Sequence, residues 1–192
     1  MSIGILGGSF NPPHIGHLVL AESARDALDL ERVFFVPAWR SPFKNGYEDV
    51  DPHLRSEMVA LAIEGNTSFT LDTCEIGRGD VSYTIDTVRS FHERFPRDTL
   101  FLILGSDAFR DFPAWKEPGE ILRFATCAVA MRAGEAADFA HHPFIDKTCF
   151  FEMPPLDISS THVRERIRSG RSIRYLVPEA VRRLIIEQNL YR

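Results

Sequence analysis

Cysteine is scarce in this sequence of 192 residues: Cys74, Cys127 and Cys149 are the only three, and they are widely spaced. An odd number of cysteines without a CxxC pair argues against both a disulfide framework and a cysteine-based zinc site. We therefore expect reduced thiols with a mainly structural role, as is usual in a cytosolic protein.

Long apolar runs are lacking as well. No stretch approaches the roughly 20 apolar residues that a membrane helix requires. At the N-terminus the chain passes from Met1 into a strand-like segment, with no basic region ahead of an apolar one, so we expect no signal peptide. These absences predict a cytoplasmic protein that has no membrane partner.

An excess of positive charge is also missing. The chain has 22 lysines and arginines against 27 aspartates and glutamates, a net charge of −5. A nucleic-acid footprint would need a basic surface, so we expect no nucleic-acid partner. A mildly acidic protein can still bind phosphate groups where a few cations converge.

What the sequence does have is a regular alternation of short apolar runs and segments of helical periodicity. The predicted strands cover residues 2–6, 32–37, 70–76, 100–104, 126–131 and 149–152, and the predicted helices cover residues 17–28, 54–63, 85–95, a segment ending at 168, and 179–188. Such alternation predicts an α/β fold: a Rossmann-like, doubly wound parallel sheet with helices on both faces and a helical C-terminus. The length fits a single domain spanning residues 1–192.

The first predicted strand is followed by the segment GGSFNPPHIGH, from Gly7 to His17. In open α/β sheets ligands bind beyond the carboxyl ends of the strands. Glycines let the backbone approach a phosphate, and free N–H groups at a helix start near His17 would favour an anion. His14 and His17, three residues apart, can face the same site. The segment is neither a Walker loop nor a GxGxxG fingerprint. A structural turn is the alternative, but the length and place of this cluster favour function.

A second motif, LDISSTHVR, spans residues 156–164. We expect Ser160 or Thr161 to cap a helix and to donate to an anion, with Arg164 one turn into that helix. A guanidinium there would add a bidentate phosphate contact. Taken alone, the motif is no stronger than an ordinary helix cap.

Together, HxGH after the first strand and ISSTxxR near the end resemble the HxGH nucleotidyltransferase superfamily. Three further segments are similar to those of bacterial nicotinate-nucleotide adenylyltransferases: SYTIDT at 82–87, GSD at 105–107 with Trp115 downstream, and YLVP at 175–178. The resemblance covers residues 3–191.

The resemblance implies an enzyme that transfers AMP from ATP to nicotinate mononucleotide, giving deamido-NAD and pyrophosphate in NAD biosynthesis. It also implies Mg²⁺ bound with ATP as the cofactor, and ATP and nicotinate mononucleotide as the partners. The sequence leaves association into a homo-oligomer open. It predicts no protein-held metal site, because His141 and His142 lack a convincing third ligand.

The resemblance also implies roles for particular residues. The catalytic contacts to the ATP phosphates fall to His14 and His17. ATP and phosphate binding is implied for Gly7, Gly8, Ser9, Phe10, Lys44, Ser160, Thr161 and Arg164. The nicotinate nucleotide is implied to lie against Tyr83, Thr84, Gly105, Asp107 and Trp115. Arg132 joins this group because it follows the strand 126–131 at a ligand-facing end; a solvated arginine is the alternative there.

The chain departs from the family pattern in places. Ser9 and Asn11 stand where the family often has Thr and Asp, and Phe43 stands where a histidine often precedes the equivalent of Lys44. Two rival functions stay open. The acceptor could be nicotinamide mononucleotide or phosphopantetheine, or the chain could be a non-catalytic nucleotide-sensing module. A sensing module would be expected to have lost a histidine or the Ser160–Arg164 motif, and both are present.

Overall fold

The computed structural model describes residues 1–42, 50–131 and 139–192. The chain divides into two compact units. The first consists of Met1–Gly7, Val19–Phe34 and Tyr83–Pro155, and the second of Gly8–Leu18, Phe35–Ser82 and Leu156–Arg192. Residues that follow the first strand therefore open the second unit.

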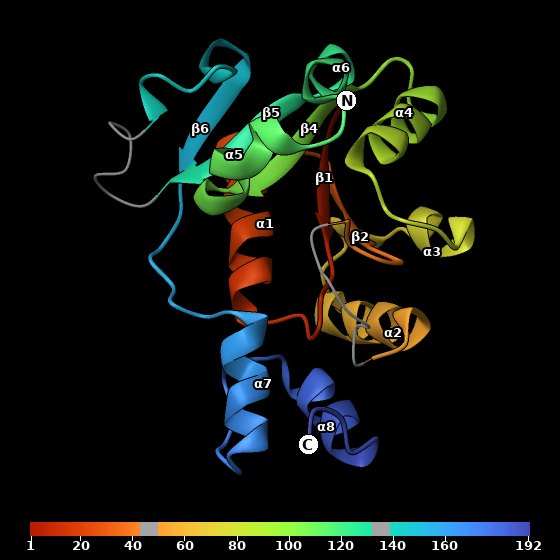
Figure 1. Cartoon of the computed structure of the whole chain (residues 1–192), viewed down its shortest axis with the longest axis vertical. Helices are drawn as coiled ribbons and strands as arrows, with labels where there is room; N and C mark the ends of the chain where they lie inside the picture. The colour runs from red at the N-terminus through yellow and green to blue at the C-terminus, as the bar shows by residue number, and fades with distance from the viewer. Residues whose placement is uncertain (43–49, 132–138) are drawn as a thin grey trace. The chain divides into compact units, whose positions relative to one another are not determined.

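Six strands form one sheet, in the order β3-β2-β1-β4-β5-β6. Its first-unit strands β1, β4, β5 and β6 lie side by side in that order in Figure 1. Their bounds are β1 Ser2–Gly8, β2 Arg32–Pro37, β3 Phe69–Leu71, β4 Thr99–Gly105, β5 Thr126–Met131 and β6 Thr148–Glu152. In the first unit β1, β4, β5 and β6 pair in parallel, with Ile3 opposite Leu100 and Leu102 opposite Cys127. This is the Rossmann-like α/β sheet that the alternating pattern predicts.

Helices follow the strands as expected. Their bounds are α1 Ile15–Ala27, α2 Pro52–Ile63, α3 Cys74–Arg78, α4 Thr84–Arg94, α5 Ser106–Asp111, α6 Pro118–Phe124, α7 Ser160–Arg168 and α8 Glu179–Glu187, with 3₁₀ turns η1 Phe112–Ala114 and η3 Ile145–Lys147. Each predicted helix is present, with its ends shifted by one or two residues. In the described residues, no helix has the length and hydropathy needed to cross a bilayer.

The predicted strand at 70–76 is wrong after Leu71. β3 ends at Leu71, and Asp72 Oδ1 then accepts a hydrogen bond of 3.0 Å from the Cys74 amide. This local turn starts α3, which stops at Gly79 with φ +68°. Side-chain-to-backbone bonding therefore overrides the β propensity of the segment.

Helices α5 and α6 were not predicted, because this stretch is rich in proline and charge. Pro118 occupies the first turn of α6, where a missing N–H costs nothing. The predicted cap of α7 is also wrong: Ser159, not Ser160 or Thr161, accepts the hydrogen bond from the His162 amide, at 3.1 Å.

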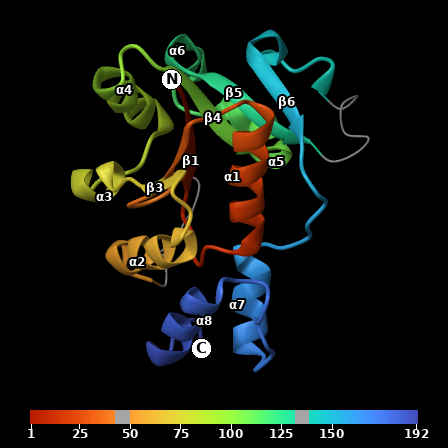
Figure 2. The same ribbon diagram turned by 180° about the vertical axis from the view of Figure 1, so that it is seen from behind.

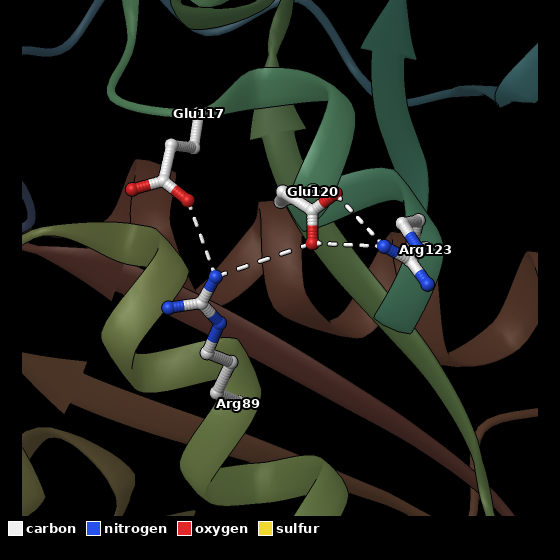
Figure 3. Close-up of polar contacts among 4 residues, drawn as sticks. All are labelled: Arg89, Glu117, Glu120 and Arg123. Atoms are coloured by element: carbon white, nitrogen blue, oxygen red, sulfur yellow. Dashed lines mark hydrogen bonds and ion pairs between the residues drawn. The ribbon is translucent and has the colours of Figure 1, made fainter.

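In the first unit α4 and α6 are linked at the surface (Figure 3). Arg89 Nη2 lies 3.1 Å from Glu117 Oε2 and 4.0 Å from Glu120 Oε2, and Arg123 Nη1 lies 3.0 Å from Glu120 Oε1. Exposed pairs of this kind contribute little stability each. They link the start of α6 to α4, and residues next to both elements belong to the candidate site described below.

The core of the second unit is built by α2, α7 and α8. Val163 of α7 and Val181 of α8 are fully buried together with Met58 of α2.

The three cysteines are free, and burial raises the pKa of the Cys127 thiol to about 12. Such a thiol stays protonated near pH 7, in keeping with the predicted structural role.

Candidate active site

The two histidines of the first loop form a stacked pair in the second unit. Their ring centroids are 3.7 Å apart, and the centroid of the Phe10 ring lies 4.9 Å from that of His17 in an edge-on arrangement. The His14 amide donates a 3.1 Å hydrogen bond to His17 Nδ1. Because Nδ1 accepts, a neutral His17 carries its ring proton on Nε2. His17 is thereby oriented as a hydrogen-bond donor, which suits a phosphate oxygen.

His14 lies deeper, with 7% of its surface exposed. Burial lowers the pKa of its imidazole from 6.5 to about 4, so the ring is neutral at pH 7. Its Nδ1 is the single buried side-chain nitrogen or oxygen without a hydrogen-bond partner among the residues that the structure describes. An unpaired buried polar atom of this kind calls for an explanation, and a ligand that completes the site supplies one.

Gly16 explains the spacing of the HxGH motif. A Cβ atom at this position would lie 3.0 Å from Nδ1 and 3.1 Å from Cε1 of His14. The stacked position of the His14 ring therefore depends on the missing side chain.

The helix start differs from the prediction. α1 begins at Ile15, whose amide donates to the Leu176 carbonyl at 2.9 Å, and the His17 amide donates to the His14 carbonyl at 3.0 Å. These two N–H groups hold the turn together and are not available to an anion. The expectation of free N–H groups at this helix start is thus wrong for the amides of Ile15 and His17.

The second motif contacts the first loop, a meeting that the sequence did not predict. Ser160 Oγ donates to the Pro12 carbonyl at 2.9 Å, and Arg164 Nη1 donates to the Asn11 carbonyl at 2.8 Å. Arg164 Nη2 also donates to Thr161 Oγ1 at 3.0 Å. We call this assembly of the first loop and the start of α7 the phosphate cradle. The contact of these side chains with the triphosphate itself stays a prediction.

Arg55 of α2 is a residue that the sequence reasoning missed. Its side chain is fully buried and donates to the carbonyls of Ser9 at 2.6 Å, Trp39 at 2.9 Å and Val50 at 3.3 Å. It thus joins the first loop to two other segments and places a buried positive charge against the Ser9 carbonyl of that loop. Nothing in the periodicity of α2 marks this arginine, because surface helices commonly carry arginines.

Tyr191 was missed as well. Its hydroxyl donates to Asn11 Oδ1, and both side chains are buried. Asn11 is therefore held through its carbonyl by Arg164 and through its side chain by Tyr191. The departure from the family pattern at Asn11 thus falls on a residue with a structural hydrogen bond.

The predicted nicotinate residues lie in the first unit. Tyr83 caps α4, Thr84 is its first residue, Gly105 ends β4, and Asp107 lies in α5. Lys116, which sequence reasoning did not select, has its Nζ 4.2 Å from the centroid of the Tyr83 ring.

This contact places the segment after Trp115 over the N-terminus of α4. Trp115 is half-buried, and the centroid of its ring lies 5.4 Å from that of Phe112. The structure thus brings the Tyr83 ring next to Lys116, the residue after Trp115, while the contact of Tyr83, Thr84 and Trp115 with the nicotinate nucleotide stays a prediction.

Other predicted residues take varied positions. Gly7 and Gly8 end β1, and a Cβ on Gly8 would lie 3.3 Å from the Phe10 ring. Lys44 and Arg132 lie outside the described residues. In the described ranges, no group of three or more His, Cys, Asp or Glu side chains is placed to hold a metal ion.

A Rossmann-like sheet is followed after its first strand by a loop that carries a stacked histidine pair, and a serine and an arginine from a C-terminal helix donate to the backbone carbonyls of that loop. This is the arrangement expected of a nucleotidyltransferase with an HxGH motif. The model of the Cytidylyltransferase-like family matches residues 5–166. The chain is 41% identical to a protein of Desulfitobacterium hafniense (strain Y51) called "Probable nicotinate-nucleotide adenylyltransferase", over 99% of this chain and 95% of that one. A protein of the same name from Thermus thermophilus is also 41% identical, over 100% of both chains.

Among solved structures, the Plasmodium falciparum nicotinic acid mononucleotide adenylyltransferase complexed with NaAD superimposes with a TM-score of 0.84. The two chains share 21% sequence identity, and the match covers 99% of this chain and 97% of that one, so it supports the fold. The chain therefore belongs to the Cytidylyltransferase-like family and, within it, to the nicotinate-nucleotide adenylyltransferases.

Replacing Arg164 with alanine is expected to raise the KM for ATP by about tenfold, because the charge-assisted phosphate contact predicted for this side chain, worth roughly 1.5 kcal/mol, would be lost together with its hydrogen bond to the Asn11 carbonyl. Initial rates measured against ATP concentration test this. Arg166, two residues along α7, is the matched control, since its Nε instead donates to the Ser172 carbonyl. An unchanged KM in the Arg164 variant would make this residue purely structural.

The burial of His14 predicts a pH dependence of stability. The folded pKa of about 4 lies below the ordinary value of 6.5, so the unfolded chain binds the proton more tightly, and stability falls as pH falls from about 6.5 to 4. Between pH 7.5 and pH 5 this amounts to about 2 kcal/mol at 1.36 kcal/mol per unit. Urea unfolding at both pH values should show that the His14→Asn variant lacks this part of the decrease. Equal decreases in the wild type and the variant would contradict it.

Proposed function

We propose that the protein transfers the adenylyl group of ATP to nicotinate mononucleotide, yielding deamido-NAD and pyrophosphate. The observation that carries this proposal is the phosphate cradle: a stacked His14–His17 pair with a buried, unpaired nitrogen on His14, in a loop whose backbone carbonyls accept from Ser160 and Arg164. The names of the full-length relatives support the choice of reaction.

The proposed reaction does not require a general base. The nucleophile is the phosphate monoester of nicotinate mononucleotide, whose second pKa is about 6, so it is largely dianionic near pH 7. One of its oxygens attacks the α-phosphorus of ATP, the bond from that phosphorus to the β-bridging oxygen breaks, and pyrophosphate leaves with the electron pair. No covalent enzyme intermediate is needed.

The difficulty is that an anion attacks within a polyanion. Positioning the two substrates in line and stabilising the charge that develops on phosphate oxygens then supply the rate. His17 Nε2–H is the donor directed at the transferring phosphate, since Nδ1 is occupied by the His14 amide. His14 stays neutral and stacks on His17, so it fixes the angle of that ring.

The nicotinate end is assigned to the first unit. The N-terminus of α4 at Thr84 offers backbone N–H groups and a positive dipole end, which suit the carboxylate of nicotinate. Lys116 beside Tyr83 adds a positive charge to the same place. The Trp115 ring supplies a flat face for the pyridine ring.

The side chains of the phosphate cradle decide whether the protein itself could hold Mg²⁺. Its imidazole and guanidinium groups donate hydrogen bonds and do not fit Mg²⁺, which takes oxygen ligands in octahedral geometry. We therefore assign Mg²⁺ to the phosphate oxygens of ATP, with which it enters, and place no metal ligand on these side chains. Bound in this way, Mg²⁺ neutralises part of the phosphate charge.

Product analysis tests the proposed reaction. Purified protein supplied with ATP, Mg²⁺ and nicotinate mononucleotide should form deamido-NAD and pyrophosphate in equal amounts, as measured by mass spectrometry and an enzyme-coupled pyrophosphate assay. Release of inorganic phosphate in place of pyrophosphate, or pyrophosphate without deamido-NAD, would contradict it.

A further inference from the structure

The second unit contains a pocket of about 540 Å³ at the C-terminal end of α7. It is bounded by the end of α7, the segment that follows and α8, and these two helices lie side by side in both views (Figures 1 and 2). Its apolar lining includes the buried Ile173 and Ile185 and the half-exposed Ile186. The volume is within the range of roughly 300–1,000 Å³ that is typical of small-molecule sites.

Four arginines also line this pocket: Arg168, Arg171, Arg182 and Arg192. They belong to an unusually basic segment. Residues 160–192 contain eight arginines and three glutamates, although the whole chain has a net charge of −5. The pocket therefore combines an apolar interior with a concentration of guanidinium groups.

One acidic side chain already pairs with this set. Glu179 accepts from Arg182 at 2.8 and 2.6 Å, which offsets the charge of that arginine. Arg171 and Arg192 are exposed, and they add positive charge beyond the Arg182–Glu179 pair. A ligand with more than one negative charge matches this arrangement.

The pocket is separate from the phosphate cradle. Ser160 and Arg164 act at the first turns of α7, whereas Arg168 is its last residue. At 1.5 Å per residue, Ser160 and Arg168 are separated by about 12 Å along the helix axis. A ligand of ordinary size in the pocket would thus leave the cradle open.

We propose that this pocket binds a phosphate monoester that carries an apolar group. A phosphate monoester has a charge of about −1.5 to −2 at pH 7 and accepts bidentate hydrogen bonds from guanidinium groups. The apolar group covers Ile173, Ile185 and the exposed face of Ile186, while the phosphate meets the arginines. This site lies outside the adenylyl-transfer chemistry and takes no part in it.

The probe is monooctyl phosphate, used below its micelle concentration and titrated calorimetrically into the full chain without ATP or acceptor. We expect one molecule to bind per chain. Octyl glucoside, which has the same tail without charge, and inorganic phosphate, which is the head group alone, should each bind at least about tenfold more weakly. Octyl glucoside binding as tightly as octyl phosphate would overturn the role of the arginines.

Two double variants make the matched comparison. R168Q/R171Q removes two charges from the pocket, and R174Q/R183Q removes two from the same segment outside its lining. We expect at least about tenfold weaker binding in the first and wild-type affinity in the second. Equal losses of affinity in both variants would mean that binding depends on nonspecific electrostatic attraction. Wild-type affinity in both would mean that the ligand binds elsewhere. Either result overturns the proposal.

A single variant, I186E, covers the case in which R168Q/R171Q does not fold. It introduces a negative charge at a half-exposed position of the lining and should also abolish binding. Retained affinity in a folded I186E would overturn the proposal as well. Because binding is measured without substrates, failure here leaves the proposed adenylyl transfer untouched.

Discussion

Replacing His17 with alanine is expected to lower kcat by about 10²–10³-fold while the fold stays intact. The reason is that His17 Nε2–H is an oriented donor: its other ring nitrogen accepts from the His14 amide, and its ring is packed between His14 and Phe10. Removing one preorganised donor to a transferring group typically costs this much. Single-turnover rates at saturating ATP and acceptor measure the effect.

His141 offers a matched control for this experiment, since it is an exposed histidine of the first unit. His141→Ala should keep wild-type turnover, and circular dichroism should show that both variants are folded. A folded His17→Ala protein with near-normal kcat would remove His17 from the reaction centre.

Replacing Arg55 with methionine is expected to lower the free energy of unfolding by about 3–5 kcal/mol. Methionine fills much of the same volume but leaves three carbonyls, those of Ser9, Trp39 and Val50, without this donor. Each unsatisfied buried group costs about 1–3 kcal/mol, and partial relaxation reduces the total. Urea unfolding followed by tryptophan fluorescence gives the difference.

Arg123 provides the comparison for Arg55. It is an exposed arginine whose pair with Glu120 lies at the surface, so Arg123→Met should stay within about 0.5 kcal/mol of the wild type. A loss below about 1 kcal/mol in Arg55→Met would show that the buried guanidinium does not hold the first loop.

The sheet and the first loop were predictable because their signals are local. Apolar runs mark strands such as 100–104, and the Gly, Pro and His residues of 7–17 stand in direct succession after one of them. The rule that ligands gather beyond strand ends then selects His14 and His17. The approach fails where a short polar side chain acts on the backbone, as Asp72 does when it ends β3.

The supports of the site were not predictable, because they join residues far apart in the sequence. Arg55 reaches back 46 residues to Ser9, and Tyr191 reaches back 180 residues to Asn11. No periodicity or motif encodes such a pairing; only the folded chain brings the partners together. The contact between Lys116 and Tyr83, at the proposed binding site of the acceptor, was not predictable for the same reason.

The choice of acceptor is the central claim, and the ratio of kcat/KM for nicotinate and nicotinamide mononucleotide tests it most directly. The two differ by a carboxylate against an amide. An amide would bring its own N–H₂ toward the amides at Thr84 and toward Lys116, leaving at least one donor unpaired at about 1–3 kcal/mol. We therefore expect pyrophosphate release, measured with saturating ATP and Mg²⁺, to favour nicotinate mononucleotide roughly tenfold to a hundredfold, with no release when phosphopantetheine is the acceptor. Equal or better use of the amide substrate or of phosphopantetheine would contradict the account.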